Sequence, residues 1–185
     1  MRSLVPAGFT EVDPRTARRR VLGTCAPAPG ADARFALVPL VVVDLGSRVA
    51  RGHGALRLAP LHLLLWERRT VRIPRGACVV LRTGRADDAP DDGPDGCPGL
   101  SDDATGWLVD HRGALAVGSD RALDPGTAGQ VVARGGVVVR CDPEVLADVR
   151  PVGSWAVLGP VVTVFCPPAA DAVPAQRARR RLLPR

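Results

Sequence analysis

Residues 72–84 are Arg-Ile-Pro-Arg-Gly-Ala-Cys-Val-Val-Leu-Arg-Thr-Gly, the most informative segment of the sequence. Its Pro-Arg-Gly turn leads into the apolar and partly β-branched run 77–81. Such a run, bounded by turn residues, predicts a buried strand that is entered from a tight turn.

The segment before this strand, residues 58–69, predicts a helix and ends in Trp-Glu-Arg-Arg. Pro60 suits the first helical turn, where its missing N–H is not needed. Three leucines at helical spacing share one face of this helix: Leu61, Leu64 and Leu65. The centre of the chain is therefore predicted to be a helix, a turn and a strand.

Further elements follow from the same kinds of pattern. Residues 37–44 form a near-continuous apolar run, which is typical of a strand buried on both faces. Residues 101–113 predict a helix with Ser101 as its N-cap and Gly113 at its end. Strands are predicted for 114–120, 136–141 and 161–166, and a turn for 123–126.

Length and composition indicate one globular domain. The chain has 185 residues and a mass of 19.4 kDa, enough for a single core. No apolar run reaches the roughly 18 residues of a membrane span, and the N-terminus is too poor in apolar residues for a signal peptide. We therefore expect a cytoplasmic protein with reduced thiols and no membrane partner.

The net charge of +6 raises the question of nucleic acid as a partner. All 25 basic residues are arginine, and lysine, asparagine and tyrosine are absent. This is the composition that a GC-rich coding sequence gives to any protein, and aromatics at 3% provide few platforms for stacking bases. Composition therefore argues against nucleic acid, although a basic anion-binding or nucleic-acid-binding module stays as an alternative function.

Several of these segments together resemble the cyclase family of metal-dependent hydrolases, which includes bacterial kynurenine formamidases. The resemblance covers about residues 37–160 and rests on Trp-Glu-Arg-Arg with Arg-Ile-Pro-x-Gly, then Pro-Gly-Leu-Ser, Val-Gly-x-Asp and Leu-Asp-Pro-Gly in that order. It implies an α/β fold, a single swivelling β/β/α domain with a mixed sheet core. It also implies amide hydrolysis in tryptophan catabolism, with zinc or manganese as the cofactor.

The family's metal motif, His-x-Gly-Thr-His-x-Asp-x-Pro-x-His, has no intact copy here. Gly23-Thr24 and Ala28-Pro29 match its backbone-setting residues, within a stretch that reads as a loop. The ligand positions then fall on residues that are neither histidine nor aspartate: Val21, Cys25, Pro27 and Ala31. This is either the altered motif or an unrelated loop in a chain from which the true segment is deleted. On either interpretation no metal cofactor is expected.

Cys25 and Cys141 are the only candidate catalytic residues. Cys25 stands at a ligand position, and Cys141 stands where the resemblance places a glutamate. We expect the two to approach each other, since the corresponding family segments converge on one metal. Thiolates bind zinc or act as nucleophiles when their pKa is lowered. His53 and His62 are interpreted as solvated or helix-capping histidines instead of ligands.

The function thus stays open between three hypotheses. The favoured one is an inactive member of the family, a pseudoenzyme that binds a small molecule or a partner. The second is an active hydrolase with a rebuilt thiolate site, and the third is the basic binding module. The resemblance also implies self-association, and we expect a homodimer with the acidic loop, Asp87 to Asp95, outside its interface.

The chain is divided into three parts on the same grounds. Residues 1–36 form a variable N-terminal segment that includes the altered motif, and 37–166 form the cyclase-like core. Residues 167–185 form a segment rich in proline and arginine, interpreted as a solvated basic tail.

Overall fold

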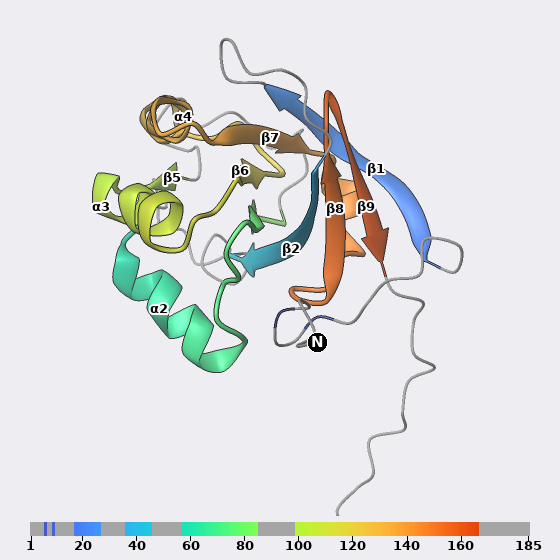
Figure 1. Ribbon diagram of the computed structural model, residues 1–185, viewed down its shortest axis with the longest axis horizontal. Coiled ribbons are helices and arrows are strands. Elements are labelled where there is room, and N and C mark those ends of the chain that lie inside the picture. The colour runs from blue at the N-terminus through green and yellow to red at the C-terminus, as the bar shows by residue number, and fades with distance from the viewer. Residues whose placement is uncertain are drawn as a thin grey trace, which may run out of the picture.

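The computed structural model describes Pro6, Phe9 and residues 17–26, 36–45, 57–84 and 99–166. Within these residues, seven strands close into a barrel in the order β1-β7-β6-β4-β2-β8-β9. Figure 1 shows helices α2, α3 and α4 together on one side of this barrel. The barrel strands are β1 Arg18–Ala26, β2 Ala36–Asp44, β4 Cys78–Arg82, β6 Ala116–Ser119, β7 Val137–Cys141, β8 Ser154–Leu158 and β9 Val161–Cys166.

The remaining elements form the helical layer and its connections. Two short strands, β3 Arg57–Leu58 and β5 Gly99–Leu100, pair in parallel outside the barrel. The helices are α2 Pro60–Arg69, α3 Asp102–Gly106, the π-helix η2 Trp107–His111, α4 Pro125–Ala133 and α5 Pro143–Ala147. No helix among the described residues is long and apolar enough to cross a membrane.

The barrel is mixed, which confirms the predicted α/β fold with a mixed sheet core. Strands β2, β4, β6 and β7 are neighbours and parallel, whereas β1, β8 and β9 pair antiparallel. Strand β2 is central and buried on both faces, as its apolar run predicts. Its Leu40 and Val42 face the barrel interior, while Val41 and Val43 pack in the core beneath the helices.

The predicted helix at residues 58–69 is confirmed as α2, with Pro60 in its first turn. His62 caps this same helix, because its Nδ1 accepts a hydrogen bond from the Ala59 backbone N–H at 3.0 Å. That contact confirms the capping interpretation of His62. The predicted Ser101 N-cap of α3 is also confirmed, since Ser101 Oγ accepts from the Ala104 N–H.

The structure shows which way the leucine face of α2 is turned, which the spacing of the leucines does not determine. Leu61, Leu64 and Leu65 do share one face, but it is the exposed one. Leu63 is fully buried instead, and Trp66 packs partly buried against the same core. Helical spacing fixes which residues align, and tertiary contacts decide which face turns inward.

Three interpretations of local structure were wrong or incomplete. Residues 21–26 were expected in a loop, but they are the second half of strand β1. Helix α4 was expected only as the turn 123–126, although Asp124 caps it and Pro125 begins it. Helix α5 has the same signal in Asp142 and Pro143, and it was missed. His53, Pro27, Ala31, the acidic loop and the C-terminal segment lie outside the described residues.

Gly23 offers a test of the barrel closure. A Cβ built on Gly23 would lie 1.8 Å from the Arg140 carbonyl oxygen of β7, a distance that forces the two strands apart. We expect Gly23→Ala to lower the free energy of unfolding by about 3 kcal/mol, as overpacking does. Gly129→Ala is the matched control, because nothing lies within 4 Å of its Cβ position in α4. That change should raise stability by about 0.5–1 kcal/mol in denaturant unfolding. Equal effects of the two changes would contradict the packing described for β1.

Candidate functional site

A buried carboxylate organises the carboxyl end of the parallel strands. Asp120 follows β6, is 1% exposed, and accepts hydrogen bonds from the backbone N–H groups of Thr83 and Gly84. The hydroxyls of Thr83 and Ser119 also donate to it. Its oxygens are therefore engaged in joining β6 to the end of β4, which is a structural role.

Cys141 lies beside Asp120 at this end of the barrel. Ser119 of β6 pairs with Arg140 of β7, so Asp120 and Cys141 each follow by one residue on neighbouring parallel strands. Ligands of open α/β sheets bind at such carboxyl ends. The geometry thus places Cys141 at the edge where a site would be expected in a parallel sheet.

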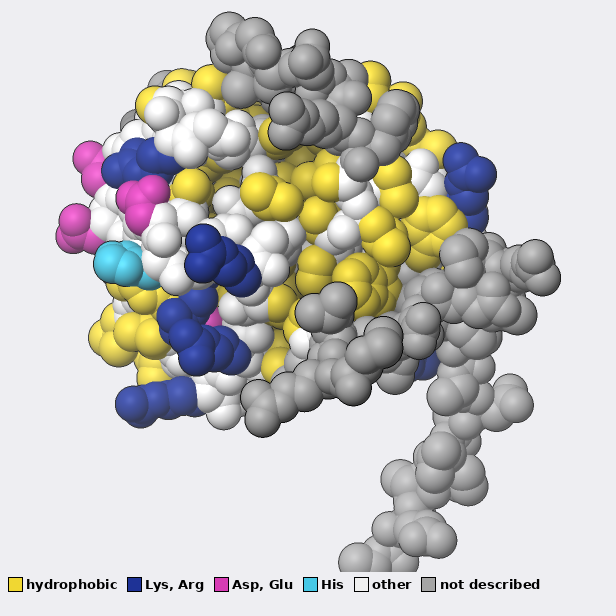
Figure 2. Space-filling view, in the orientation of Figure 1, with side chains coloured by type: hydrophobic (Ala, Val, Ile, Leu, Met, Phe, Trp, Pro, Cys, Tyr) yellow, Lys and Arg dark blue, Asp and Glu magenta, His cyan; other side chains and the backbone are white. Residues whose placement is uncertain are grey.

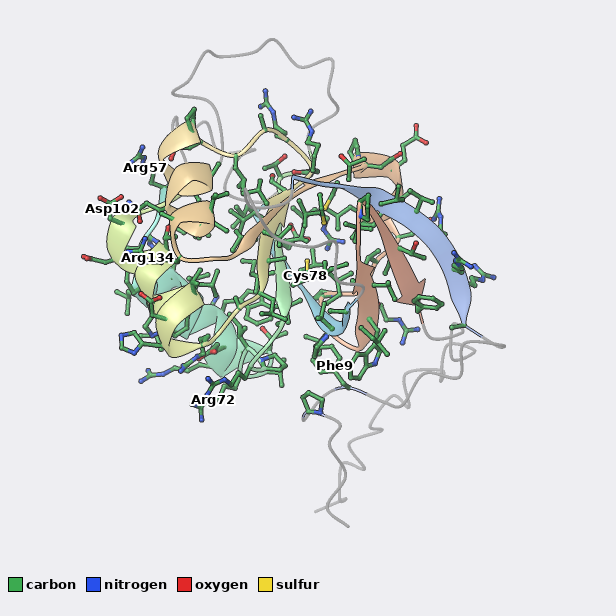
Figure 3. All side chains as sticks on the ribbon, turned by 45° about the horizontal axis from the view of Figure 1, so that its top comes forward. Phe9, Arg57, Arg72, Cys78, Asp102 and Arg134 are labelled. Atoms are coloured by element: carbon green, nitrogen blue, oxygen red, sulfur yellow. The ribbon has the colours of Figure 1, made fainter. Side chains whose placement is uncertain are left out.

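The structure brings Cys25 and Cys141 to neighbouring strands. Cys25 of β1 pairs with Val139 of β7, and Cys141 pairs with Gly23. The two cysteines are therefore diagonal neighbours on one face, where Cα atoms lie about 7–8 Å apart. That spacing exceeds the roughly 4.4–6.8 Å of a disulfide. Figure 3 places a third cysteine, the fully buried Cys78 of β4, inside the barrel.

All three thiols are held in their protonated form. Burial raises the pKa of Cys141, and the nearby negative charges of Asp120 and an ionised Cys25 would raise it further. Burial also raises the pKa of Cys78, with added contributions from Cys141 and Cys25. For the half-buried Cys25, burial raises the pKa and a backbone hydrogen bond with Gly159 opposes this in part. These are the properties of structural thiols, since reactive cysteines have a lowered pKa.

Helix α5 lies across the same end of the barrel. Its Leu146 and the following Val149 belong to the apolar cluster of the barrel interior. Arg82, at the end of β4, donates to the carbonyls of Leu146 and Val149 at 3.2 and 3.0 Å, and it pairs with Asp44 of β2 at 2.6 Å. Apolar contacts and a charged clamp therefore close this end of the barrel.

The motif positions that the structure describes, Val21 and Cys25, do not fit a zinc or manganese ion. Val21 is 58% exposed, whereas Cys25 packs against the interior cluster, so these two motif positions do not face one space. Val21 has no donor atom. Within the described part of the chain, no three His, Cys, Asp or Glu side chains gather closely enough to hold a metal ion.

A pocket lies at the opposite, amino-terminal end of the parallel strands. Its volume is about 380 Å³, and it opens between the loop before β4 and the end of η2. The lining residues are Pro6, Arg72, Ile73, Pro74, Arg75, His111 and Arg112. Arg72 and Arg75 are exposed and have no ion pair among the described residues, so the pocket presents two uncompensated positive charges.

Glu67 fixes the wall of this pocket. Its Oε1 accepts a hydrogen bond from the Ile73 backbone N–H at 2.8 Å, and both of its oxygens pair with the Arg112 guanidinium at 2.8 and 2.7 Å. The Arg112 guanidinium also lies 4.3 Å from the Trp107 ring centroid. Arg112 is thus neutralised and immobilised. No local pattern in the sequence predicts this pocket, although Arg72 and Arg75 flank the Ile73-Pro74 step in the segment before β4.

Comparisons with known proteins identify the class of fold. The Cyclase family model matches residues 26–123. Isatin hydrolase A from Ralstonia solanacearum is 23% identical with a TM-score of 0.59, over 70% of this chain and 60% of that one. An isatin hydrolase bound to the product analogue thioisatinate is 14% identical with a TM-score of 0.60, over 86% and 87% of the two chains. A potential metal-dependent hydrolase with cyclase activity is 17% identical with a TM-score of 0.50, over 88% and 94%. No curated protein sequence matches the chain at a significant level.

The chain belongs to the cyclase family, because the family model matches more than half of its residues. The solved structures, all below 25% identity, show the shared fold. The chain spans about three-fifths of the length of the Ralstonia isatin hydrolase A. The family match begins at Ala26 and ends at Leu123, so neither Cys25 nor Cys141 lies within it.

The buried thiols predict a specific loss of stability in alkali. The ordinary thiol pKa is 9.0, and those of Cys78 and Cys141 are raised in the folded chain. Above pH 9 the unfolded chain therefore releases protons that the folded chain keeps. The stability that the protonated thiols contribute is complete below pH 9. Above pH 9, the free energy of unfolding should fall by up to about 1.4 kcal/mol per pH unit for each buried thiol. Lysine and tyrosine are absent, so few other groups titrate there.

Denaturant unfolding between pH 8 and 11 measures this slope. Cys141→Ala should make the slope shallower, although the cavity lowers stability at every pH. Val139→Ala is the control, since it is a similar truncation on the same strand without a thiol, and it should keep the slope. An unchanged slope in Cys141→Ala would show that this thiol is not held protonated by the fold.

Proposed function

We propose that this cyclase-family protein does not hydrolyse amides through a bound metal and works by binding instead. The single observation that supports this most is the environment of Val21, Cys25 and Cys141. One side chain is aliphatic and turned to solvent, and the other two are thiols on neighbouring strands that belong to no metal-binding group of three side chains among the described residues. A metal lowers the pKa of its bound water only when several ligands hold it in an open site.

The rebuilt thiolate site is less well supported as an alternative. A nucleophilic cysteine needs a partner that lowers its pKa, such as a histidine or a helix N-terminus. After burial, the charge with the largest effect on the pKa of Cys141 is the Asp120 carboxylate, which raises it, and Arg140 opposes this only in part. His62, one of the two described histidines, caps α2 in the helical layer.

We therefore expect no hydrolysis of N-formylkynurenine or a simple aryl formamide above the uncatalysed rate, with or without added zinc or manganese. Elemental analysis of the purified chain should give well below one divalent ion per molecule. Circular dichroism of the same sample controls for folding. Zinc-dependent turnover that is abolished by Cys25→Ala or Cys141→Ala would overturn the proposal and favour the rebuilt thiolate site.

A second candidate function, binding of a small anion, is favoured by the arginine pocket. Its volume of about 380 Å³ lies in the lower part of the usual range for ligand sites. Arg72 and Arg75 provide charge, and Ile73 and Pro74 provide an apolar wall. Guanidinium groups bind carboxylates and phosphates through paired hydrogen bonds. We propose a small carboxylate with an apolar body as the matching class of ligand.

Calorimetric titration with benzoate and with inorganic phosphate tests this candidate. Arg72→Ala and Arg75→Ala should each weaken benzoate binding about tenfold, the effect of losing one charge-assisted hydrogen bond. Arg19→Ala is the control, because Arg19 is an exposed arginine on β1 that does not line the pocket. Equal loss in all three variants would indicate attraction by the net charge alone and would count against the pocket.

A further inference from the structure

One wall of the arginine pocket contains a π-helical turn. The Arg112 backbone N–H donates to the Trp107 carbonyl at 3.1 Å. An α-helix joins residues that are four apart, so this π-turn holds one residue more. The wider turn brings Arg112 into line with Trp107, and the Arg112 guanidinium lies 4.3 Å from the ring centroid. π-Turns are rare, and many of them lie at functional sites. This one holds Arg112 at the edge of the pocket.

Gly113 follows the π-turn in the left-handed conformation, with a φ of +66°. A glycine in this conformation commonly ends a helix, because it has no Cβ to clash with the neighbouring carbonyl. The Gly113 carbonyl accepts a hydrogen bond from the Gly76 backbone N–H at 2.9 Å. Gly76 follows Arg75 in the turn before β4. The backbone of Gly113 therefore joins the end of η2 to the turn that carries an arginine of the pocket.

The side chain of Arg75 lies against the backbone of Gly113. A Cβ built on Gly113 would lie 2.9 Å from the Arg75 Cγ and 3.4 Å from its Nε. Carbon atoms in contact are normally about 3.5–4.0 Å apart, so a side chain at position 113 would displace Arg75. Arg75 also lines the pocket. Figure 2 shows basic side chains gathered in the lower part of the helical side, where Figure 3 places Arg72. Gly113 thus confines the stem of Arg75 at the edge of the pocket.

Gly135 shows that a glycine at a helix end does not require such a neighbour. It follows α4 with a φ of +75°, close to the value for Gly113. Nothing lies within 4 Å of a Cβ built on Gly135. The two glycines share a backbone conformation, and of the two it is Gly113 that has an arginine packed on it. The contact with Arg75 is therefore a feature of the pocket and not of the left-handed turn.

We propose that Gly113 is a positioning residue of the anion pocket, because its missing side chain leaves the space in which Arg75 lies. This inference rests on the binding of a small carboxylate proposed above. A long side chain loses rotamer freedom when it binds a ligand, and a side chain that is already confined loses less. Gly113 therefore acts through Arg75 and does not itself touch the anion.

Calorimetric titration of the full chain with benzoate tests the positioning role. Gly113→Ala should weaken benzoate binding about tenfold, as Arg75→Ala does, although it changes no charge. Gly135→Ala is the matched control, since it places the same side chain in the same conformation where nothing is displaced. Both changes should lower the melting temperature by about 2–8 °C, and Gly135→Ala should keep the affinity for benzoate. Equal affinities of the two variants would overturn the proposal.

A second variant keeps the test decisive if Gly113→Ala does not fold. Gly113→Asn also carries a Cβ, and asparagine adopts the left-handed conformation more readily than alanine does. It should weaken benzoate binding by a similar factor. Gly135→Asn is its control and should bind benzoate as the wild type does.

Double variants show whether Gly113 acts through Arg75. Adding Gly113→Ala to Arg75→Ala should cause no further loss of affinity, because the side chain that Gly113 positions is gone. Adding Gly113→Ala to Arg72→Ala should multiply the two losses to about a hundredfold. Equal further losses in both backgrounds would show that Gly113 shapes the pocket in general, and the positioning of Arg75 would be wrong.

Failure of this inference can be distinguished from failure of the anion site. A wild type that binds no benzoate rejects the site itself. Binding that is weakened by Arg75→Ala but not by Gly113→Ala keeps the site and rejects the positioning role. In the ligand-free chain, the heteronuclear NOE of the Arg75 Nε–H group should exceed that of the exposed Arg19 and fall to the Arg19 level in Gly113→Ala. A wild-type value already at the Arg19 level would show that Arg75 is not confined.

Discussion

The Glu67 carboxylate is the contact on which the arrangement of the helical layer depends. It belongs to α2, and it binds the Ile73 backbone in the loop before β4 and the Arg112 side chain after η2. Glu67 and Arg112 are 9% and 15% exposed at their side chains, so solvent compensates little for the loss of either partner. Breaking such a pair by removing one member costs about 3–5 kcal/mol. Three segments that are distant in sequence are therefore fixed by one ion pair.

The same contact has two consequences for the surface. Glu67 lies four residues after Leu63, so both point to the barrel side of α2. That rotation leaves the face of Leu61, Leu64 and Leu65 exposed. The ion pair with Glu67 also neutralises Arg112, so Arg72 and Arg75 supply the positive charge of the pocket. The leucine face and the anion pocket are thus two results of how one helix is oriented.

Much of this fold could be predicted from local patterns, because strands and capped helices leave local signals. The apolar run of β2 and the Ser101 cap of α3 are examples, and both are confirmed. The orientation of α2 could not be predicted, since it depends on a pairing between residues 67 and 112 across 45 positions. The proximity of Cys25 and Cys141 likewise could not be predicted, since it depends on the register between β1 and β7. Asp124-Pro125 and Asp142-Pro143 did carry a local signal for α4 and α5, and it was overlooked.

The interior of the barrel is filled by aliphatic and thiol side chains that pack against one another. Ligand clusters bring polar or charged groups together in a partly dry site, and such sites generally cost stability. Cys78 and Cys141 are small apolar fillers when protonated, and they pack among valines and leucines of the interior cluster. Asp120 has its oxygens satisfied by backbone and hydroxyl donors, so burying it needs no metal. Because each of these residues is accommodated by contacts within the chain, their burial is explained by the stability of the fold, and we propose that the function lies on its outer surfaces.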